Sequence, residues 1–252
     1  MPKRIEYQPH TRGSEAQIKG RQLLVQLFQE TPLPVEELLI NLGLYTRSGA
    51  FAKVLFLDEI YRQVLSVPGD VIEFGTWWGQ SLVTFLNLRA VHEPYSARKV
   101  IGFDTFAGYP KPGHRDKPSE VIKEGGYGVS DDYVAYLTRL LTYHEQENVM
   151  AHRKKFELVP GDVMQTVPKF FAERPEQIIA LAFFDMALYE PTKQALTTIQ
   201  DRLVKGSILA FDELNDPEYP GETEAVREVI GLRNCEFRRS KYLPDRTYAV
   251  IT

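Results

Sequence analysis

The stretch GDVIEFGTWWGQS, residues 69–81, decides the fold of this chain. It begins with a short apolar run rich in β-branched residues and passes through a turn that contains two glycines. It then leads into SLVTFLNLRAV at 81–91, whose apolar residues recur at helical spacing. A strand that passes through a tight turn directly into a helix is the opening of a strand–helix–strand unit.

The same alternation continues to the end of the chain. Four further apolar runs with strand character lie at 99–104, 155–162, 179–185 and 207–214. Segments with helical character lie between them, at 131–147, 167–175 and 191–204. Apolar strands that alternate with helices predict a mostly parallel, doubly wound sheet covered on both faces. CEFRRSKYL at 235–243 and RTYAVIT at 246–252, joined by Pro244-Asp245, predict a final antiparallel strand pair.

The first 68 residues have a different pattern, without strands. Ser14 is placed to cap a helix that extends to Glu30, and two further helical segments follow at 34–44 and 50–67. Pro68-Gly69 ends the last of them. We therefore expect an N-terminal helical cap over 1–68 and an α/β core over 69–252 that form one domain. The cap helices either cover the site or form an interface between subunits. We expect the protein to be a homo-oligomer.

Composition excludes several classes of protein. The 252 residues carry 30 Lys and Arg against 34 Asp and Glu, a formal net charge of -4, which does not favour a nucleic-acid binder. A hydrophobic fraction of 43% is that of a globular protein. The single cysteine, Cys235, allows no internal disulfide and no multi-cysteine metal site. The start of the chain has no signal-peptide pattern, and the apolar run at 178–184 is too short to span a membrane, so a cytoplasmic protein is expected.

Carboxylates follow the predicted strands at one edge of the sheet. Ligands of doubly wound sheets bind beyond the carboxyl ends of the strands. The acidic residues at those ends are Asp104, Asp162, Asp185 and the pair Asp212-Glu213, and Glu73 lies within the first strand. A single aspartate at such a place is often a helix cap. So many at one edge repel one another, and a cation or hydrogen-bond donors must offset that repulsion.

The first turn indicates which cofactor binds there. It lacks the middle glycine of the G-x-G-x-x-G dinucleotide pattern, and Trp77 and Trp78 crowd it. Its E-x-G-x-x-x-G spacing is instead typical of S-adenosylmethionine-dependent methyltransferases, although an ordinary glycine turn with a buried glutamate is an alternative. In this interpretation Asp104 accepts hydrogen bonds from both ribose hydroxyls and Asp162 from the adenine amino group. The candidate cofactor-binding residues are Glu73, Gly75, Thr76, Gly79, Ser81, Asp104, Thr105, Asp162 and Val163.

The fourth and fifth strand ends indicate a metal site. Asp185, Asp212 and Glu213 offer hard oxygen ligands without histidine or cysteine, which fits Mg²⁺, Mn²⁺ or Ca²⁺ rather than zinc. The alternative is that Asp185 caps a helix and that 212–216 is a solvated turn.

Five segments resemble the macrocin O-methyltransferase family, in the order in which that family has them. They are GDVIEFGTWWGQS at 69–81, FDTFAGYP at 103–110, GDVMQTVP at 161–168, FFDMALYEPTKQAL at 183–196 and ILAFDELNDPEYPGETEAV at 208–226. The last segment is similar to the branch of dTDP-6-deoxyhexose 3-O-methyltransferases. The resemblance implies a Rossmann-like class I methyltransferase fold, with S-adenosylmethionine over the first three strand ends. It also implies Mg²⁺ on Asp185, Asp212 and Glu213, and a deoxysugar hydroxyl as the acceptor in antibiotic or secondary-metabolite biosynthesis.

This chain departs from the family pattern at two positions. The family's D-G-D is Asp185-Met186-Ala187 here, so the second acid is missing, and its D-D is Asp212-Glu213. Both departures affect the expected geometry and affinity of the metal site.

For the chemistry we assign Asp185 as the general base, with His114 or His144 as the alternative. For the acceptor we assign Tyr127, between two glycines of a long polar loop, and Glu222 and Thr223. Two other functions stay open at this point: a methyltransferase for a phenol or catechol, and a non-catalytic nucleotide-binding protein with the same fold.

Overall fold

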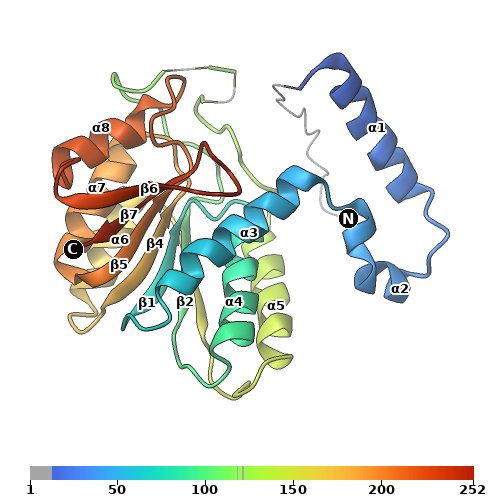
Figure 1. Ribbon diagram of the computed structural model, residues 1–252, viewed down its shortest axis with the longest axis horizontal. Helices are drawn as coiled ribbons and strands as arrows, with labels where there is room; N and C mark the ends of the chain where they lie inside the picture. The colour runs from blue at the N-terminus through green and yellow to red at the C-terminus, as the bar shows by residue number, and fades with distance from the viewer. Residues whose placement is uncertain (1–12, 118, 121) are drawn as a thin grey trace.

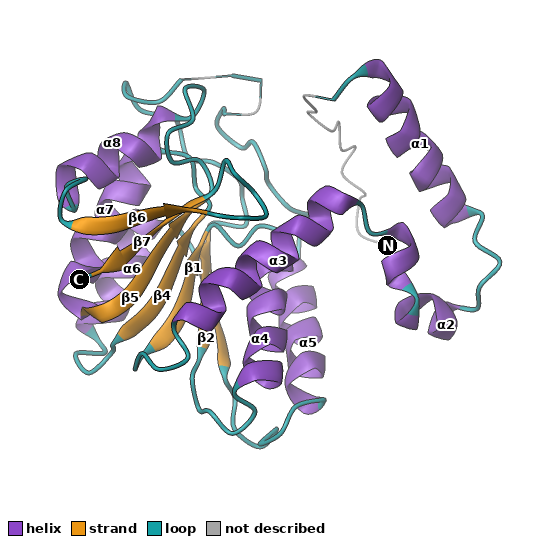
Figure 2. Cartoon of the chain, viewed as in Figure 1, coloured by secondary structure: helices purple, strands orange, loops and turns teal. Residues whose placement is uncertain are grey.

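The computed structural model describes residues 13–117, 119–120 and 122–252. The first twelve residues of the expected cap therefore lie outside the described part of the chain. Within the described residues a seven-stranded sheet has the order β3-β2-β1-β4-β5-β7-β6 (Figure 2). The strands are β1 (Asp70–Phe74), β2 (Val100–Asp104), β3 (Phe156–Pro160), β4 (Ile179–Phe184), β5 (Leu203–Phe211), β6 (Cys235–Arg239) and β7 (Thr247–Ile251). Strands β1 to β5 are parallel, and β7 runs antiparallel to both β5 and β6.

Helices cover both faces of the sheet, as the alternation predicts (Figure 1). One face carries α3 (Ser48–Gln63), α4 (Gln80–His92) and α5 (Tyr133–Gln146), and the other carries α6 (Val163–Ala172), α7 (Tyr189–Ile199) and α8 (Pro220–Val229). Alternate residues of one strand face opposite sides: Val71 packs in the cluster with α3 and α4, whereas Ile72 and Phe74 pack in the cluster with α6 and α7. All six residues of β4 are buried, as in a central parallel strand.

Several element boundaries differ from the prediction by a few residues, and two of them have a clear cause in the structure. The segment 191–204 was expected to be one helix, but α7 ends at Ile199 and Leu203 already belongs to β5, paired with Ile179 of β4. The strand partner decides this boundary, because Leu203 and Val204 fit either pattern on their own. Helix α6 begins at Val163, earlier than expected, because the side chain of Asp162 accepts a hydrogen bond from the Met164 N–H and caps it.

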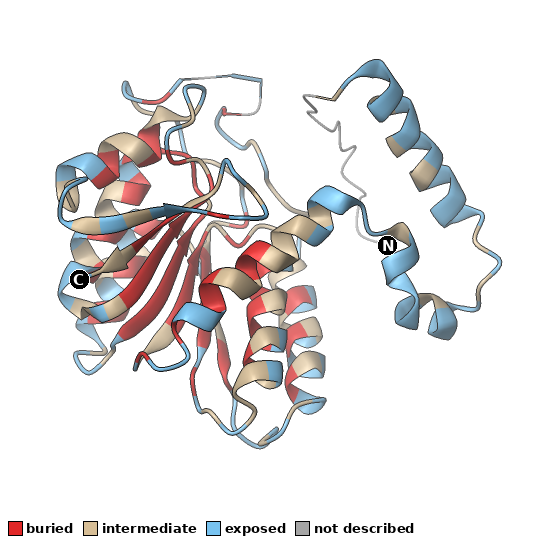
Figure 3. Cartoon of the chain, in the orientation of Figure 1, coloured by how far each residue is buried: buried red, intermediate tan, exposed pale blue. Residues whose placement is uncertain are grey.

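The N-terminal helices divide into two parts. Helix α3 packs on the sheet through Phe56, Leu57, Ile60 and Tyr61. By contrast, α1 (Glu15–Gln29), α2 (Val35–Ile40) and the short 3₁₀ helix η1 (Leu42–Tyr45) contain no buried residue. They lie apart from the sheet in Figure 1 and are largely exposed in Figure 3. Ser14 caps α1 as expected, with its side chain accepting from the Gln17 N–H. Among the N-terminal helices that the structure describes, α3 is therefore the one that covers the core.

No helix in the described part of the chain is long and apolar enough to cross a membrane.

Candidate active site

A cavity of about 340 Å³ lies at the carboxyl edge of the parallel strands. Residues from the ends of β1, β2, β4 and β5 line it, together with residues of the loop after β2. Of the residues predicted for the site, those that line it are Glu73, Gly75, Thr76, Ser81, Asp104, Thr105, Tyr127, Asp162, Val163, Asp185, Asp212 and Glu213. The sheet order brings these strand ends together, so residues far apart in the sequence share one cavity.

Three predicted site residues lie elsewhere. Gly79 stands at the start of α4 with φ of 79°, and a Cβ there would lie 2.6 Å from Leu137 of α5, so it serves helix packing. The buried Glu222 side chain accepts a hydrogen bond from the Glu213 N–H at 3.0 Å. The Thr223 hydroxyl accepts one from the Asn215 N–H at 2.7 Å. Their predicted ligand contacts stay untested, but both side chains of α8 hold the loop that carries Glu213.

The turn after β1 approaches β4 so closely that it requires glycine. Gly75 has φ of 93°, and a Cβ at this position would lie 2.0 Å from the Asp185 carbonyl oxygen. The Gly75 N–H donates to the Phe103 carbonyl, and the Asp185 N–H donates to the Phe74 carbonyl. The backbone of this turn therefore fixes the place from which the Asp185 side chain starts.

Asp104 at the end of β2 fastens two loops around the cavity. Its carboxylate accepts the Trp77 N–H at 2.7 Å and the Phe106 N–H at 2.6 Å. Burial raises the pKa of Asp104, and the backbone hydrogen bonds oppose that rise. Each carboxylate oxygen has a second acceptor position, so Asp104 retains the capacity to bind hydroxyls.

The alternative is that these aspartates cap helices, and one of them does so. Asp162 caps α6 and lines the cavity as well. Asp185 caps no helix, because α7 begins after Leu188 without a side-chain cap. Asp212 lies eight residues before the start of α8 at Pro220. The carboxylates of the fourth and fifth strands therefore have no structural use as caps.

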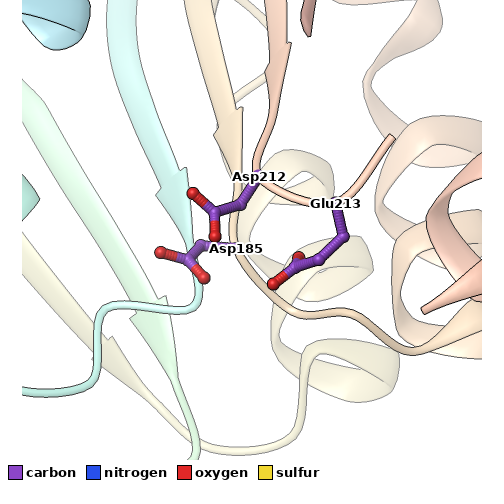
Figure 4. Close-up of side chains that lie close together, drawn as sticks. All are labelled: Asp185, Asp212 and Glu213. Atoms are coloured by element: carbon purple, nitrogen blue, oxygen red, sulfur yellow. The ribbon is translucent and has the colours of Figure 1, made fainter. Parts of the chain in front are cut away.

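Asp185, Asp212 and Glu213, here called the acidic cluster, lie side by side (Figure 4). One carboxylate oxygen from each lies within 4.8 Å of the others. Burial and then the charge of Asp185 raise the pKa of Asp212 to about 6, and burial followed by Asp212 and Glu222 raises that of Glu213 well above its usual value. Among the described residues nothing donates a hydrogen bond to the buried Oε2 of Glu213. This donor set fits a hard divalent cation.

Ala187 supplies no ligand to the cluster. It is buried with φ of 58° and packs with Ile122 and Leu188 in a small apolar group. The acid that the family pattern has at this position is therefore replaced by a packing contact.

Among the described residues, two basic side chains reach the acidic cluster, and neither is among the residues predicted from the sequence. Lys53 of α3 places its Nζ 3.2 Å from Oδ2 of Asp185, and Arg246 places its Nε 2.5 Å from Oδ1 of Asp212. Burial lowers the pKa of Lys53, but Asp185, Asp212 and Glu73 together outweigh it, so the net pKa is raised. Lys53 had a signal in the sequence, since it is the one charged residue of 48–57. Arg246 lies in a loop, and no pattern in the sequence pointed to it.

Glu73 of β1 lines the cavity and is 1% exposed. Burial, followed by the charge of Asp185, raises its pKa well above the usual value, while Lys53 opposes the rise. Burial therefore favours the protonated form of Glu73 more than it would for an exposed glutamate.

Aromatic side chains form another wall of the cavity. Tyr127, with φ of 60°, lies edge-on to Trp77 at 5.0 Å and to Tyr109 at 5.5 Å between ring centroids. Tyr109 was not predicted for the site; burial, then Glu213 and Asp185, raise its pKa. Neither His114 nor His144 is among the described residues that line the cavity, so Asp185 stays the candidate base.

The sheet order, the glycine turn after β1 and the acid at the end of β2 define a class I S-adenosylmethionine-dependent methyltransferase fold, as predicted. The O-methyltransferase NovP shares this fold, with a TM-score of 0.61 at 20% identity. The chain belongs to the TylF family: the family model of macrocin-O-methyltransferase (TylF) matches residues 53–234. The resemblance stated from the sequence is confirmed.

Relatives with greater similarity are also methyltransferases. The crystal structure of CalS11, a calicheamicin methyltransferase, is 42% identical with a TM-score of 0.92, covering 95% of this chain and 94% of that one. The apo structure of CalS11, named there a TDP-rhamnose 3'-O-methyltransferase, is 41% identical with a TM-score of 0.82, covering 95% and 96%. A tetracenomycin rhamnosyl 4'-O-methyltransferase from Streptomyces olivaceus is 27% identical over 158 residues, 58% of this chain. The matches span about half the length of the curated relatives.

Proposed function

We propose that this protein transfers the methyl group of S-adenosylmethionine to a hydroxyl of a deoxysugar, nucleotide-linked or glycosidic, in antibiotic or secondary-metabolite biosynthesis. The observation that carries the proposal is a single cavity that joins Asp104 and Asp162 to the acidic cluster beneath an aromatic wall. The 42% identity to CalS11 over nearly the whole chain supports it.

The residues of this chain divide the work of the reaction. The cavity and the carboxylates of Asp104 and Asp162 suit a cofactor with hydroxyl and amino donors. Bound there, S-adenosylmethionine supplies a methyl group on a positively charged sulfur. An acceptor hydroxyl would take up this methyl group, with S-adenosylhomocysteine as the other product. Asp185 takes the hydroxyl proton.

We also propose that Mg²⁺ binds to Asp185, Asp212 and Glu213. The support is the close approach of three carboxylates, one with an oxygen that lacks a hydrogen-bond donor in the described structure. When bound, the ion lowers the pKa of the acceptor hydroxyl and so favours its deprotonation.

The acceptor is proposed from the shape and chemistry of the cavity wall. Tyr109, Tyr127 and Trp77 offer ring faces and edges to the C–H groups of a sugar, and the acidic cluster lies next to Tyr109. A TDP-linked 6-deoxyhexose is the substrate class we favour, because the CalS11 structure is that of a TDP-rhamnose methyltransferase. A phenol or catechol acceptor remains the second candidate.

A methyl-transfer screen tests this function. Purified protein with S-adenosylmethionine is offered TDP-rhamnose, catechol and a glycosylated natural product, each with Mg²⁺ or with excess chelator, and methylated products are measured by mass spectrometry. We expect methylated TDP-sugar with Mg²⁺ and loss of turnover with chelator. Methylation of catechol alone would overturn the proposed sugar acceptor. Full turnover in chelator would overturn the proposed metal requirement. An absence of S-adenosylhomocysteine binding would favour a non-catalytic protein.

Three further expectations stay proposals. We propose that the chain forms a homo-oligomer through α1 and α2, because their apolar side chains Leu23, Leu27 and Ile40 are exposed by 54%, 49% and 81%. A second copy of the chain is the partner we favour, since soluble oligomers are mostly assemblies of identical chains. The residues 1–68 and 69–252 form one domain in this proposal, since Lys53 of the cap lines the cavity of the core. The cytoplasmic location stays a prediction.

A further inference from the structure

Lys53 is the one basic residue among the described residues that line the cavity. It comes from α3, outside the strand ends that carry the rest of the site. Its Nζ lies 5.8 Å from the ring centroid of Phe183, next to the 3.2 Å contact with Asp185. The buried face of α3, with Phe56 and Leu57, fixes the helix on the sheet and therefore the point from which the Lys53 side chain extends.

The two basic contacts of the acidic cluster differ in access. Arg246 pairs with Asp212, whose side chain is 9% exposed, and does not line the described cavity. Lys53 pairs with Asp185, and the two side chains are 25% and 29% exposed. A divalent ion that enters from the cavity therefore meets the Lys53 ammonium at the Asp185 carboxylate.

A carboxylate oxygen that already pairs with an ammonium is a weaker ligand for a metal ion. The ion must break or lengthen that pair, and it must also approach a positive charge at close range, where Coulomb repulsion is strong in a partly buried site. The flexible four-carbon stem of lysine allows the ammonium to move away without moving the backbone. Mg²⁺ and Lys53 thus compete for the same charge.

We propose that Lys53 is a built-in competitor of the divalent cation: its ammonium neutralises Asp185 in the metal-free site, and metal binding must displace it. This inference rests on the metal site proposed above. It makes Lys53 a positioning residue that sets the affinity of the acidic cluster for metal. The missing acid at Ala187 strengthens the effect, because the cluster has one carboxylate fewer with which to hold the ion.

The test measures binding of Mn²⁺ alone, without cofactor or acceptor, from the paramagnetic resonance signal of the free ion. We expect Lys53→Met to bind Mn²⁺ at least about tenfold more tightly than the natural chain, the scale by which residues next to metal ligands alter affinity. Lys53→Arg keeps the charge and is expected to keep the natural affinity. The matched control is Lys205→Met, on the exposed part of β5, with no expected change.

A further variant locates the effect. Adding Asp185→Asn to Lys53→Met is expected to abolish the gain, because the ligand released by the lysine is then lost. Binding of S-adenosylhomocysteine and the melting temperature check that Lys53→Met, Lys53→Arg and the double variant are folded.

Equal or weaker Mn²⁺ binding by folded Lys53→Met overturns the proposal, as does an absence of binding by both proteins. The result of this Mn²⁺ binding test can be distinguished from the result of the methyl-transfer screen. Chelator-resistant turnover by the natural chain overturns its metal requirement even where Lys53→Met gains Mn²⁺ affinity. A metal requirement with no gain in Lys53→Met overturns the role of Lys53 alone.

Discussion

Asp104 has two tasks at once. The sequence predicts a ligand for ribose hydroxyls, and the structure adds that the same carboxylate fastens the backbone at Trp77 and Phe106. Both residues have positive φ, 47° and 54°, a conformation that side chains rarely adopt. The hydrogen bonds to Asp104 therefore help to hold the loops in the form that borders the cavity.

The Asp104→Asn variant tests whether the Asp104 carboxylate binds the cofactor, because it replaces one carboxylate oxygen with an amide nitrogen. The neutral amide weakens charge-assisted bonds, each worth about 1.5–3 kcal/mol, so we expect S-adenosylhomocysteine to bind about 10–100-fold more weakly. Isothermal titration calorimetry measures the affinity. Asp70→Asn, at the opposite end of β1, is the control and is expected to leave it unchanged. Natural affinity in a folded Asp104→Asn protein would contradict the assignment.

Glu222 makes stability depend on pH. Burial raises its pKa to about 8, while the Glu213 N–H that it accepts opposes the rise. An unfolded glutamate loses its proton near pH 4.5, so the folded state binds the extra proton between that pH and about 8. Its contribution to stability is therefore complete below pH 4.5 and is lost progressively as the pH rises to about 8.

We expect Glu222→Gln to remove this loss, because the amide keeps an acceptor oxygen and carries no charge. The variant should be more stable than the natural chain by about 1 kcal/mol or more at pH 8 and nearly equal at pH 5, a pKa unit being worth about 1.4 kcal/mol. Urea unfolding at the two pH values measures this. Glu176→Gln, on an exposed loop, is the control; parallel pH profiles of Glu222→Gln and the natural chain would rule out the effect.

At the scale of elements, the closeness of β1 and β4 places Asp185. Gly75 directly follows β1, with φ of 93° and no room for a Cβ against the Asp185 carbonyl. We expect Gly75→Ala to lower the free energy of unfolding by about 2 kcal/mol or more, and to reduce methyl transfer further because Asp185 shifts. Gly49→Ala in α3 is the control, since nothing lies within 4 Å of its added Cβ.

Urea unfolding and initial rates measure the two effects. The control is expected to change stability by less than about 1 kcal/mol, in either direction. Equal stability and activity of the two variants would show that the junction tolerates a side chain, and that Gly75 has no part in positioning Asp185.

At the scale of the whole molecule, α1 contains no buried residue, and its described ring contact is that of Phe28 with Tyr45. Helix α1 is capped at its start by Ser14 and carries Leu23 and Leu27 one turn apart, both largely exposed. A helix of this length is marginal in water without tertiary packing. The proposed oligomer supplies that packing.

We expect the double variant Leu23→Glu and Leu27→Glu to lower the mass of the assembly, measured by light scattering on a sizing column. Two charges in a contact that buries apolar side chains remove burial and are themselves costly to desolvate. Gln22→Glu with Gln29→Glu adds the same charge to α1 at polar positions and is expected to leave the mass unchanged. A natural chain that is monomeric, or a mass that both pairs leave intact, would contradict this interface.

The sequence by itself determined the strand and helix order and the row of carboxylates at one edge of the sheet. Both are local: an apolar run ends at a glycine or an aspartate, and parallel strands place their carboxyl ends together. The family followed from five short segments, which keep their order along the chain whatever their contacts are.

Only the tertiary structure decided the partners of those residues. The end of α7 at Ile199 depends on the pairing of Leu203 with β4, and the hydrogen bond from the Glu213 N–H to Glu222 depends on how α8 meets the loop after β5. Lys53 lies 132 residues from Asp185 in the sequence, yet the packing of α3 on the sheet brings their charges to 3.2 Å. Long-range packing and Coulomb forces act through space, so no local pattern of residues encodes them.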